Sequence, residues 1–174
     1  MNSGPPALLI AVLLGLAACS KASAASEPSP PVESGQSLLL FGPAVADVID
    51  EHPAAMVFVE YRYTTGRYRP GPWAALEATS DDLFAGVGAF IDIPLGRRCL
   101  FTPSLGAALY DEGDGLRLGY PLEFRSTIEF TWRVGAWRAG ASLAHFSNAG
   151  LGETNRGTEV LKLLWVMPLG PAAQ

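Results

Sequence analysis

The segment Leu122–Val134 alternates between apolar and polar side chains for thirteen residues. Its even positions are apolar except for Ser126, and its odd positions are all charged residues or threonines. A period of two is that of a β-strand, because successive side chains point to opposite faces. Strands of soluble proteins are usually about 5–6 residues long, whereas a tilted strand needs about 9–11 to cross a membrane. Taken alone, the segment fits a membrane barrel or a soluble sandwich equally well.

Shorter alternating runs fill the rest of the chain between residues 37 and 169, and Gly, Pro, Asn and Asp separate them. We expect eight strands, at 37–49, 54–64, 72–79, 83–93, 99–110, 120–134, 137–147 and 158–168. An even number of antiparallel strands is the rule for bacterial outer-membrane barrels. Eight strands enclose an interior that side chains fill, without an aqueous pore. The expected fold is all-β, an eight-stranded antiparallel up-and-down outer-membrane β-barrel over residues 37–169.

The composition agrees with such a barrel. Of the 174 residues, 49% are hydrophobic and only 17% are charged, against about 25% charged residues in ordinary soluble domains. No internal stretch reaches the ~20 unbroken apolar residues of a transmembrane helix. The net charge of −5 argues against nucleic acid as a partner, since a phosphate backbone is bound through an excess of Lys and Arg.

The N-terminus has the features of an exported protein. Residues 7–18 form an apolar run of signal-peptide length. Leu16-Ala17-Ala18-Cys19 reads as a lipobox with Cys19 as the lipidated residue, and Ala22-Ser23-Ala24 offers an ordinary cleavage site instead. We therefore expect a signal peptide at 1–19, a flexible Ser-, Pro- and Glu-rich linker at 20–36 and a short tail at 170–174.

The last predicted hairpin carries residues of catalytic type. His145 and Ser147 lie two apart on a strand, so they share a face. Glu159 joins them if the hairpin register places it opposite His145, because directly opposed residues point to the same face. The three residues would supply a nucleophile, a general base and a carboxylate that orients the base. Asn148 and a backbone N–H near Gly150 could donate to an oxyanion.

The face on which these residues lie is informative. Leu143, Leu161 and Leu163 share it, while Arg138 and Lys162 fall on the opposite face. A polar cluster at the edge of a membrane-facing surface is costly unless it has a function. Its natural substrate would be a lipid beside the barrel. The alternatives are that the His-x-Ser pair is structural and that the chain is a non-catalytic outer-membrane barrel or a lipid-binding lipoprotein.

The segment HFSNAGLGETNRGTE, residues 145–159, resembles the signature of the lipid A 3-O-deacylase family of outer-membrane enzymes. Residues 109–130, LYDEGDGLRLGYPLEFRSTIEF, are also similar to that family. The resemblance implies a serine esterase that removes the ester-linked 3-position acyl chain of lipid A in the outer membrane, with its site toward the outer leaflet. It implies His145, Ser147 and Glu159 as catalytic residues and Asn148 and Gly150 as oxyanion donors. It also implies no metal or cofactor, and a homodimer.

Overall fold

The computed structural model describes residues 34–49 and 53–170. The expected signal peptide, the lipidation site Cys19 and the tail after residue 170 lie outside these residues, as does the linker up to residue 33. The strands are β1 (Ser37–Ala46), β2 (Ala54–Tyr63), β3 (Pro70–Ala78), β4 (Leu83–Ile91), β5 (Ile93–Leu95), β6 (Cys99–Asp111), β7 (Leu122–Val134), β8 (Trp137–Ser147) and β9 (Thr158–Pro168). No helix in the described part is long and apolar enough to cross a membrane.

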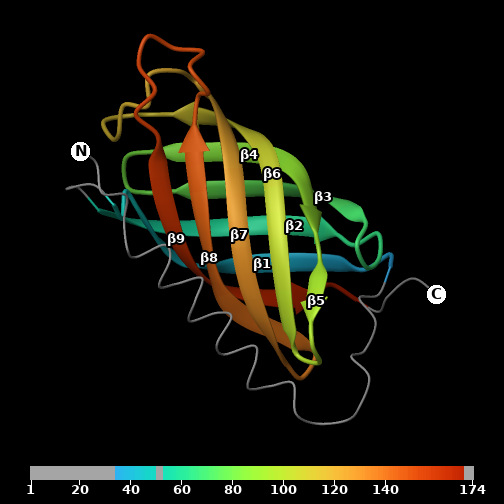
Figure 1. The fold of residues 1–174 in the computed structure, drawn as a ribbon. Coiled ribbons are helices and arrows are strands. Elements are labelled where there is room, and N and C mark those ends of the chain that lie inside the picture. The colour runs from blue at the N-terminus through green and yellow to red at the C-terminus, as the bar shows by residue number, and fades with distance from the viewer. Residues whose placement is uncertain (1–33, 50–52, 171–174) are drawn as a thin grey trace, which may run out of the picture.

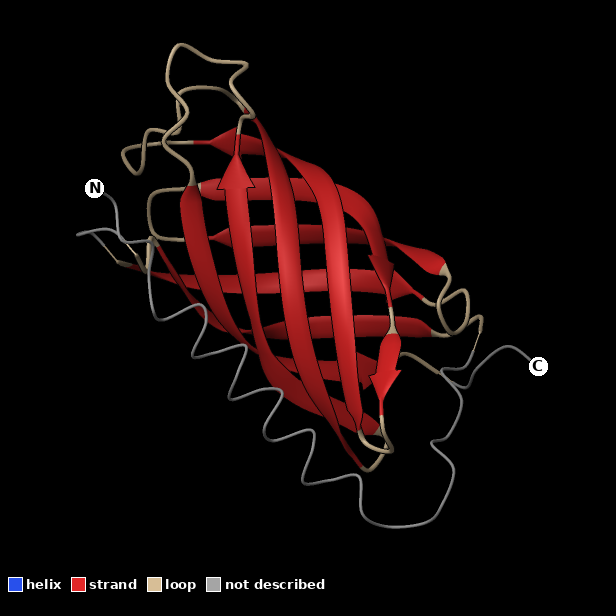
Figure 2. Ribbon diagram, in the orientation of Figure 1, coloured by secondary structure: helices blue, strands red, loops and turns tan. Residues whose placement is uncertain are grey.

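The strands form one closed antiparallel barrel (Figures 1 and 2). Each strand pairs with its neighbour in the chain, and β1 closes the sheet against β9. The short β5 continues β4 after an interruption at Asp92, because both strands pair with β6. Because β4 and β5 occupy one strand position, the barrel is eight-stranded, and the predicted fold is confirmed.

The strand bounds differ from the predicted ones mainly at the ends. The first strand ends at Ala46 and not at 49, and the third begins at Pro70 and not at 72. The predicted strand 83–93 is broken at Asp92, whose side chain turns into the interior and is 1% exposed. Strand ends depend on where pairing stops, which the alternation of side chains does not encode.

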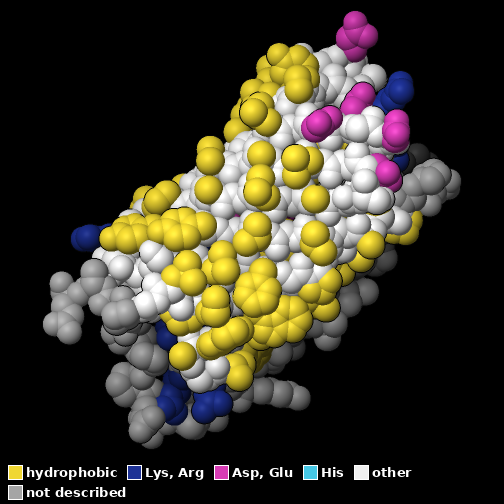
Figure 3. Space-filling model, turned by 180° about the vertical axis from the view of Figure 1, so that it is seen from behind, with side chains coloured by type: hydrophobic (Ala, Val, Ile, Leu, Met, Phe, Trp, Pro, Cys, Tyr) yellow, Lys and Arg dark blue, Asp and Glu magenta, His cyan; other side chains and the backbone are white. Residues whose placement is uncertain are grey.

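Strand β7 turns its apolar face to the outside of the barrel and its polar face to the interior. Phe124 is 41% exposed, whereas its neighbours Glu123 and Arg125 are buried at 0% and 2%. The same holds around the barrel, and Leu105 and Leu109 are 68% and 65% exposed. Seen from behind, apolar side chains are spread over the barrel wall (Figure 3). This arrangement is the reverse of a soluble sandwich, whose apolar face meets a core, and is that of a membrane barrel.

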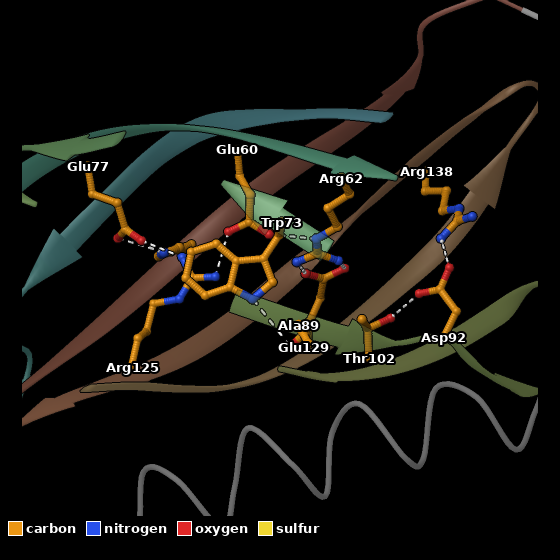
Figure 4. A network of polar contacts seen from close by, with 11 residues as sticks. Glu60, Arg62, Trp73, Glu77, Ala89, Asp92, Thr102, Arg125, Glu129 and Arg138 are labelled. Atoms are coloured by element: carbon orange, nitrogen blue, oxygen red, sulfur yellow. Dashed lines mark hydrogen bonds and ion pairs between the residues drawn. The ribbon is translucent and has the colours of Figure 1, made fainter. Parts of the chain in front are cut away.

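A network of ion pairs fills the barrel interior (Figure 4). Arg125 of β7 reaches across to Glu60 of β2 and Glu77 of β3, at 2.7 Å each. Its guanidinium lies 3.5 Å from the ring centroid of Trp73, a cation–π contact. Lys162 of β9 pairs with Glu77 at 2.6 Å. The charge of Arg125 is thus balanced by carboxylates of β2 and β3, and Lys162 of β9 is a second partner of Glu77.

The network continues toward the end of the barrel where the described residues 34–36 and 169–170 lie. Arg62 donates to Glu60 at 2.6 Å and to Glu129 at 2.7 Å. Farther along, Asp92 accepts from Arg138 at 2.9 Å and from Thr102 at 2.7 Å. Every one of these side chains is at most 8% exposed. Pairing and hydrogen bonding are what allow so many charges inside a narrow barrel.

The two ends of the barrel differ in the length of their connections. We call the loop end the one with connections 47–53, 79–82, 112–121 and 148–157, and the turn end the one with connections 64–69, 96–98 and 135–136. Figure 1 shows two of the longer connections rising together beyond β7 and β8. At the turn end, the described last residues of the expected linker are tied to the barrel, since Gly35 N–H donates to Thr64 O at 2.7 Å. The predicted hairpin site lies at the loop end.

Candidate functional site

The hairpin β8–β9 has the register that the predicted site needs. Its strands pair His145 directly with Glu159, which is the condition for Glu159 to join His145 and Ser147. His145 Nδ1 lies 3.1 Å from Glu159 Oε1, within hydrogen-bonding distance. A carboxylate on one ring nitrogen holds the imidazole in place and leaves Nε2 for a reacting group.

The pair lies on the outer wall of the barrel near the loop end. The side chain of His145 is 48% exposed and that of Glu159 is 26% exposed. Ser147 shares their face because it lies two residues from His145 on β8, and it is partly buried opposite Phe124 of β7. Leu161 and Leu163 are exposed on the same face. The structure thus brings His145, Ser147 and Glu159 to the apolar outer wall and keeps them out of the ion-pair network.

Gly157 leaves the space in which the His145 ring sits. A Cβ on Gly157 would lie 3.0 Å from His145 Cε1 and 3.1 Å from Phe146 O. Its φ of +69° is also in the left-handed region, which favours glycine. Gly157 therefore leaves room for the imidazole where it bonds Glu159, a role that the spacing of the motif did not reveal. The signal was a glycine two residues before the predicted carboxylate.

Asn148 organises the connection that follows Ser147. It is fully buried, and its Nδ2 donates to Leu118 O at 2.9 Å and to Thr154 O at 2.7 Å. Its Oδ1 accepts from Gly150 N–H at 2.9 Å, and its own N–H donates to Asn155 Oδ1 at 3.1 Å. These bonds tie the connection 148–157 to itself and to the neighbouring connection 112–121.

The two predicted oxyanion donors are therefore already engaged. Both Nδ2 hydrogens of Asn148 and the N–H of Gly150 bond acceptors within the loop end. Between them, Ala149 has a left-handed φ of 54°, and no acceptor in residues 34–49 or 53–170 bonds its N–H. The turn thus holds three donors next to Ser147, of which the Ala149 N–H is open.

Ser126 is a second hydroxyl beside the imidazole that the sequence analysis did not consider. The register of β7 and β8 pairs it directly with His145, on the side opposite Glu159. It is exposed on the outer wall. Its sequence signal was visible, since it is the one polar residue among the even positions of Leu122–Val134. The imidazole is thus flanked by Glu159 on one strand and Ser126 on the other.

No group of three or more His, Cys, Asp or Glu side chains that could hold a metal ion occurs among the described residues. The site offers a hydroxyl, an imidazole and a carboxylate as reacting groups.

Comparison with protein-family models shows which family the chain belongs to. The model described as "Lipid A 3-O-deacylase (PagL)" matches residues 56–168, more than half of the chain. The chain belongs to the lipid A 3-O-deacylase (PagL) family. The resemblance inferred from the sequence is confirmed. The match to this lipid A 3-O-deacylase family includes β8, β9 and the connection between them.

Solved structures agree with the fold of the lipid A 3-O-deacylase family. The chain is similar to the outer membrane enzyme PagL, at 17% identity and a TM-score of 0.59 over 75% of this chain and 99% of that chain. It is also similar to a de novo designed transmembrane β-barrel, at 11% identity and a TM-score of 0.53 over 80% of this chain and 100% of that chain. At such identities the likeness shows the fold, an outer-membrane type of β-barrel. No curated protein matches the chain.

Proposed function

We propose that this protein is a lipid A 3-O-deacylase, a serine esterase that hydrolyses the ester-linked 3-position acyl chain of lipid A. The observation that carries the proposal is the His145–Glu159 pair, 3.1 Å apart, beside Ser147 on an apolar outer wall. A site on that wall meets lipids that lie alongside the barrel. Membership of a lipid A deacylase family supplies the substrate.

In the proposed mechanism His145 takes the proton of the Ser147 hydroxyl, and the oxygen attacks the acyl carbonyl. Glu159 holds the imidazole by its Nδ1 and stabilises the imidazolium that forms. His145 then gives the proton to the departing sugar oxygen, which leaves an acyl-enzyme. Water, activated by the same imidazole, releases the fatty acid and restores Ser147.

Asn148 and Gly150 remain our proposed oxyanion donors. Because their hydrogens bond within the loop end, bound substrate has to replace at least one of these contacts. The open N–H of Ala149 is a third donor in the same turn and needs no such exchange. Donors held in place before the reaction stabilise developing charge without a reorganisation cost.

We also propose that the loop end faces the outside of the cell, so that the site meets the outer leaflet. Outer-membrane barrels have short turns on the periplasmic side and longer loops outside. In this barrel, the connection 148–157 between Ser147 and Glu159 is one of the longer ones. A cysteine introduced at exposed Glu153 and labelled from outside intact cells tests this orientation.

The deciding experiment measures release of 3-hydroxy fatty acid from lipopolysaccharide, with mass spectrometry of the remaining lipid A. Ser147→Ala should lower the rate by roughly 10³-fold or more, as loss of an activated nucleophile does. Ser126→Ala is the matched control, since it removes a hydroxyl that also flanks His145, and it should stay within about threefold of wild type. Full activity of Ser147→Ala, or loss of activity in Ser126→Ala alone, would reject Ser147 as the nucleophile.

Two further proposals follow from the family resemblance and the sequence. We propose a homodimer, which crosslinking in detergent and in membranes would reveal as a band of twice the mass of the mature chain. We also propose an exported chain with a lipidated Cys19, and mass spectrometry of the mature N-terminus would distinguish this from cleavage after Ala24.

A further inference from the structure

The charges at the two ends of the barrel have opposite signs. The described connections at the loop end carry six carboxylates and two arginines, Arg117 and Arg156. The described connections at the turn end carry four arginines, Arg67, Arg69, Arg97 and Arg98. Figure 3 shows acidic side chains gathered at one end and most of the basic ones toward the other. We call the three exposed arginines of these connections, Arg67, Arg69 and Arg98, the arginine collar.

The collar is not balanced by carboxylates in the described part of the turn end. Connections 64–69, 96–98 and 135–136 contain no acidic residue. The described carboxylates nearest to these connections in the chain are Glu60 and Asp92, and both are buried and bound inside the barrel, Glu60 to Arg62 and Asp92 to Arg138. The positive charge of the collar therefore faces the surroundings of the barrel.

Backbone hydrogen bonds connect the turns that carry the collar. Tyr68 N–H donates to Asp92 O at 3.3 Å, which ties the first turn to the break between β4 and β5. Arg133 N–H donates to Arg98 O at 2.8 Å, which ties the next turn to the end of β7. The arginines thus follow one stretch of the barrel rim, from β2 to β6. Arg67, Arg69 and Arg98 are exposed.

An aromatic belt places this rim at a membrane interface. Tyr63, Tyr68 and Trp137 are exposed at strand ends or turns of the turn end, at 40%, 54% and 42%. Rings of this kind mark the headgroup level in outer-membrane barrels. Arg67 donates to Tyr68 Oη at 2.6 Å, and its guanidinium lies 4.6 Å from the centroid of that ring. At least one collar arginine is therefore held at the depth of the belt.

We propose that the arginine collar binds the phosphate groups of anionic phospholipids in the leaflet at the turn end. A guanidinium presents paired N–H donors that match phosphate oxygens, and its charge attracts anionic headgroups. Under the orientation proposed above, this leaflet is the periplasmic one. Binding there would set the depth and tilt of the barrel, and so the level at which Ser147 meets its ester.

The tryptophans make the proposal testable with the full chain. Trp132, Trp137 and Trp165 lie within a few residues of the turn end, and Trp73 faces the interior. The chain is reconstituted in phosphatidylcholine vesicles that contain increasing fractions of brominated phosphatidylglycerol, and quenching of tryptophan fluorescence is measured. The comparison with brominated phosphatidylcholine gives the preference for the anionic lipid.

The wild type should bind phosphatidylglycerol about fivefold or more in preference to phosphatidylcholine, since one arginine near a charged surface contributes about that factor. The preference should fall in 0.5 M salt, where charges are screened. Arg67→Gln/Arg69→Gln/Arg98→Gln should remove most of it, and the same triple change to Lys should keep it in part. Arg117→Gln/Arg156→Gln at the loop end is the control and should leave it unchanged.

Equal quenching of the wild type by the two brominated lipids would overturn the proposal, and this result does not depend on whether any variant folds. So would a loop-end control that loses as much preference as the collar variant. Heat-modifiable gel mobility verifies that each variant forms a barrel. Ser147→Ala should keep the full lipid preference, so that failure of the proposed enzymatic function and failure of the collar are distinguishable.

Discussion

Replacing Gly157 by alanine tests whether the position of the His145 ring matters to the reaction. The added Cβ would lie 3.0 Å from His145 Cε1, whereas ordinary contacts begin at 3.4 Å. The ring must therefore retreat by about 0.4 Å, because the backbone oxygen of Phe146, at 3.1 Å, confines the Cβ on another side. This displacement strains the bond between His145 and Glu159, now 3.1 Å long.

The magnitude follows from how steeply catalysis depends on geometry. A misplacement of about 1 Å can cost roughly 100-fold in rate, so a few tenths of an ångström should cost about tenfold. That is about 1.4 kcal/mol of transition-state stabilisation. The left-handed φ of +69° adds a backbone penalty of about 1–2 kcal/mol in folding stability. Both losses are expected in Gly157→Ala.

Gly135→Ala separates the two effects. Gly135 has a similar φ of +64°, lies in the turn between β7 and β8, and has nothing within 4 Å of an added Cβ. It should lose about the same stability in urea unfolding while keeping wild-type kcat/KM for fatty acid release. If Gly157→Ala retains the activity of Gly135→Ala, the reasoning about the imidazole is refuted.

Three other substitutions test the fold and the loop. Arg125→Met removes a partner from Glu60 and Glu77 and should destabilise the barrel by about 3–5 kcal/mol, measured by urea unfolding that is followed by heat-modifiable gel mobility. Glu123→Gln is the control and should not destabilise the barrel, because it neutralises a buried carboxylate that has no hydrogen-bond partner among the described residues. Val87→Arg on the outer wall, where Val87 is 63% exposed, should cost about 2–4 kcal/mol in lipid vesicles, and a change below 0.5 kcal/mol would speak against a lipid-facing wall. Asn148→Ala removes the three side-chain hydrogen bonds that organise the connection 148–157, so we expect it to lower kcat at least tenfold. An unchanged kcat would show that Asn148 neither donates to the oxyanion nor holds the loop in a conformation that the reaction needs.

The candidate site shows which of its contacts can be predicted from residue spacing. His145 and Ser147 share a face in any β-strand, and the sequence made the grouping with Glu159 conditional on its lying opposite His145, a pairing that the structure has. Ser126 could have been placed next to His145 in the same way, because the two-residue turn Gly135-Ala136 sets the pairing of β7 with β8. The bonds of Asn148 involve Leu118 on another connection, which no local pattern reveals.

The ion pairs inside the barrel were less predictable from the sequence than the hairpin site. The alternation in Leu122–Val134 identified Glu123, Arg125 and Glu129 as one polar face, but it did not identify their partners. Arg125 pairs with Glu60 and Glu77, which are 65 and 48 residues away in the chain. Such pairs form across the lumen, so they depend on the diameter and curvature of the closed barrel. Glu123 finds no hydrogen-bonding partner within the described part.

The sequence by itself determined that the chain forms strands and which residues share each face, because a period of two is a local property of extended backbone. It also carried the motif that identifies the family. The tertiary structure decided which face points outward. Either face of an alternating strand can meet a core, and only closure of the sheet placed Arg125 inside and Phe124 outside. The same closure left His145, Ser147 and Glu159 on the outer wall, within reach of a lipid.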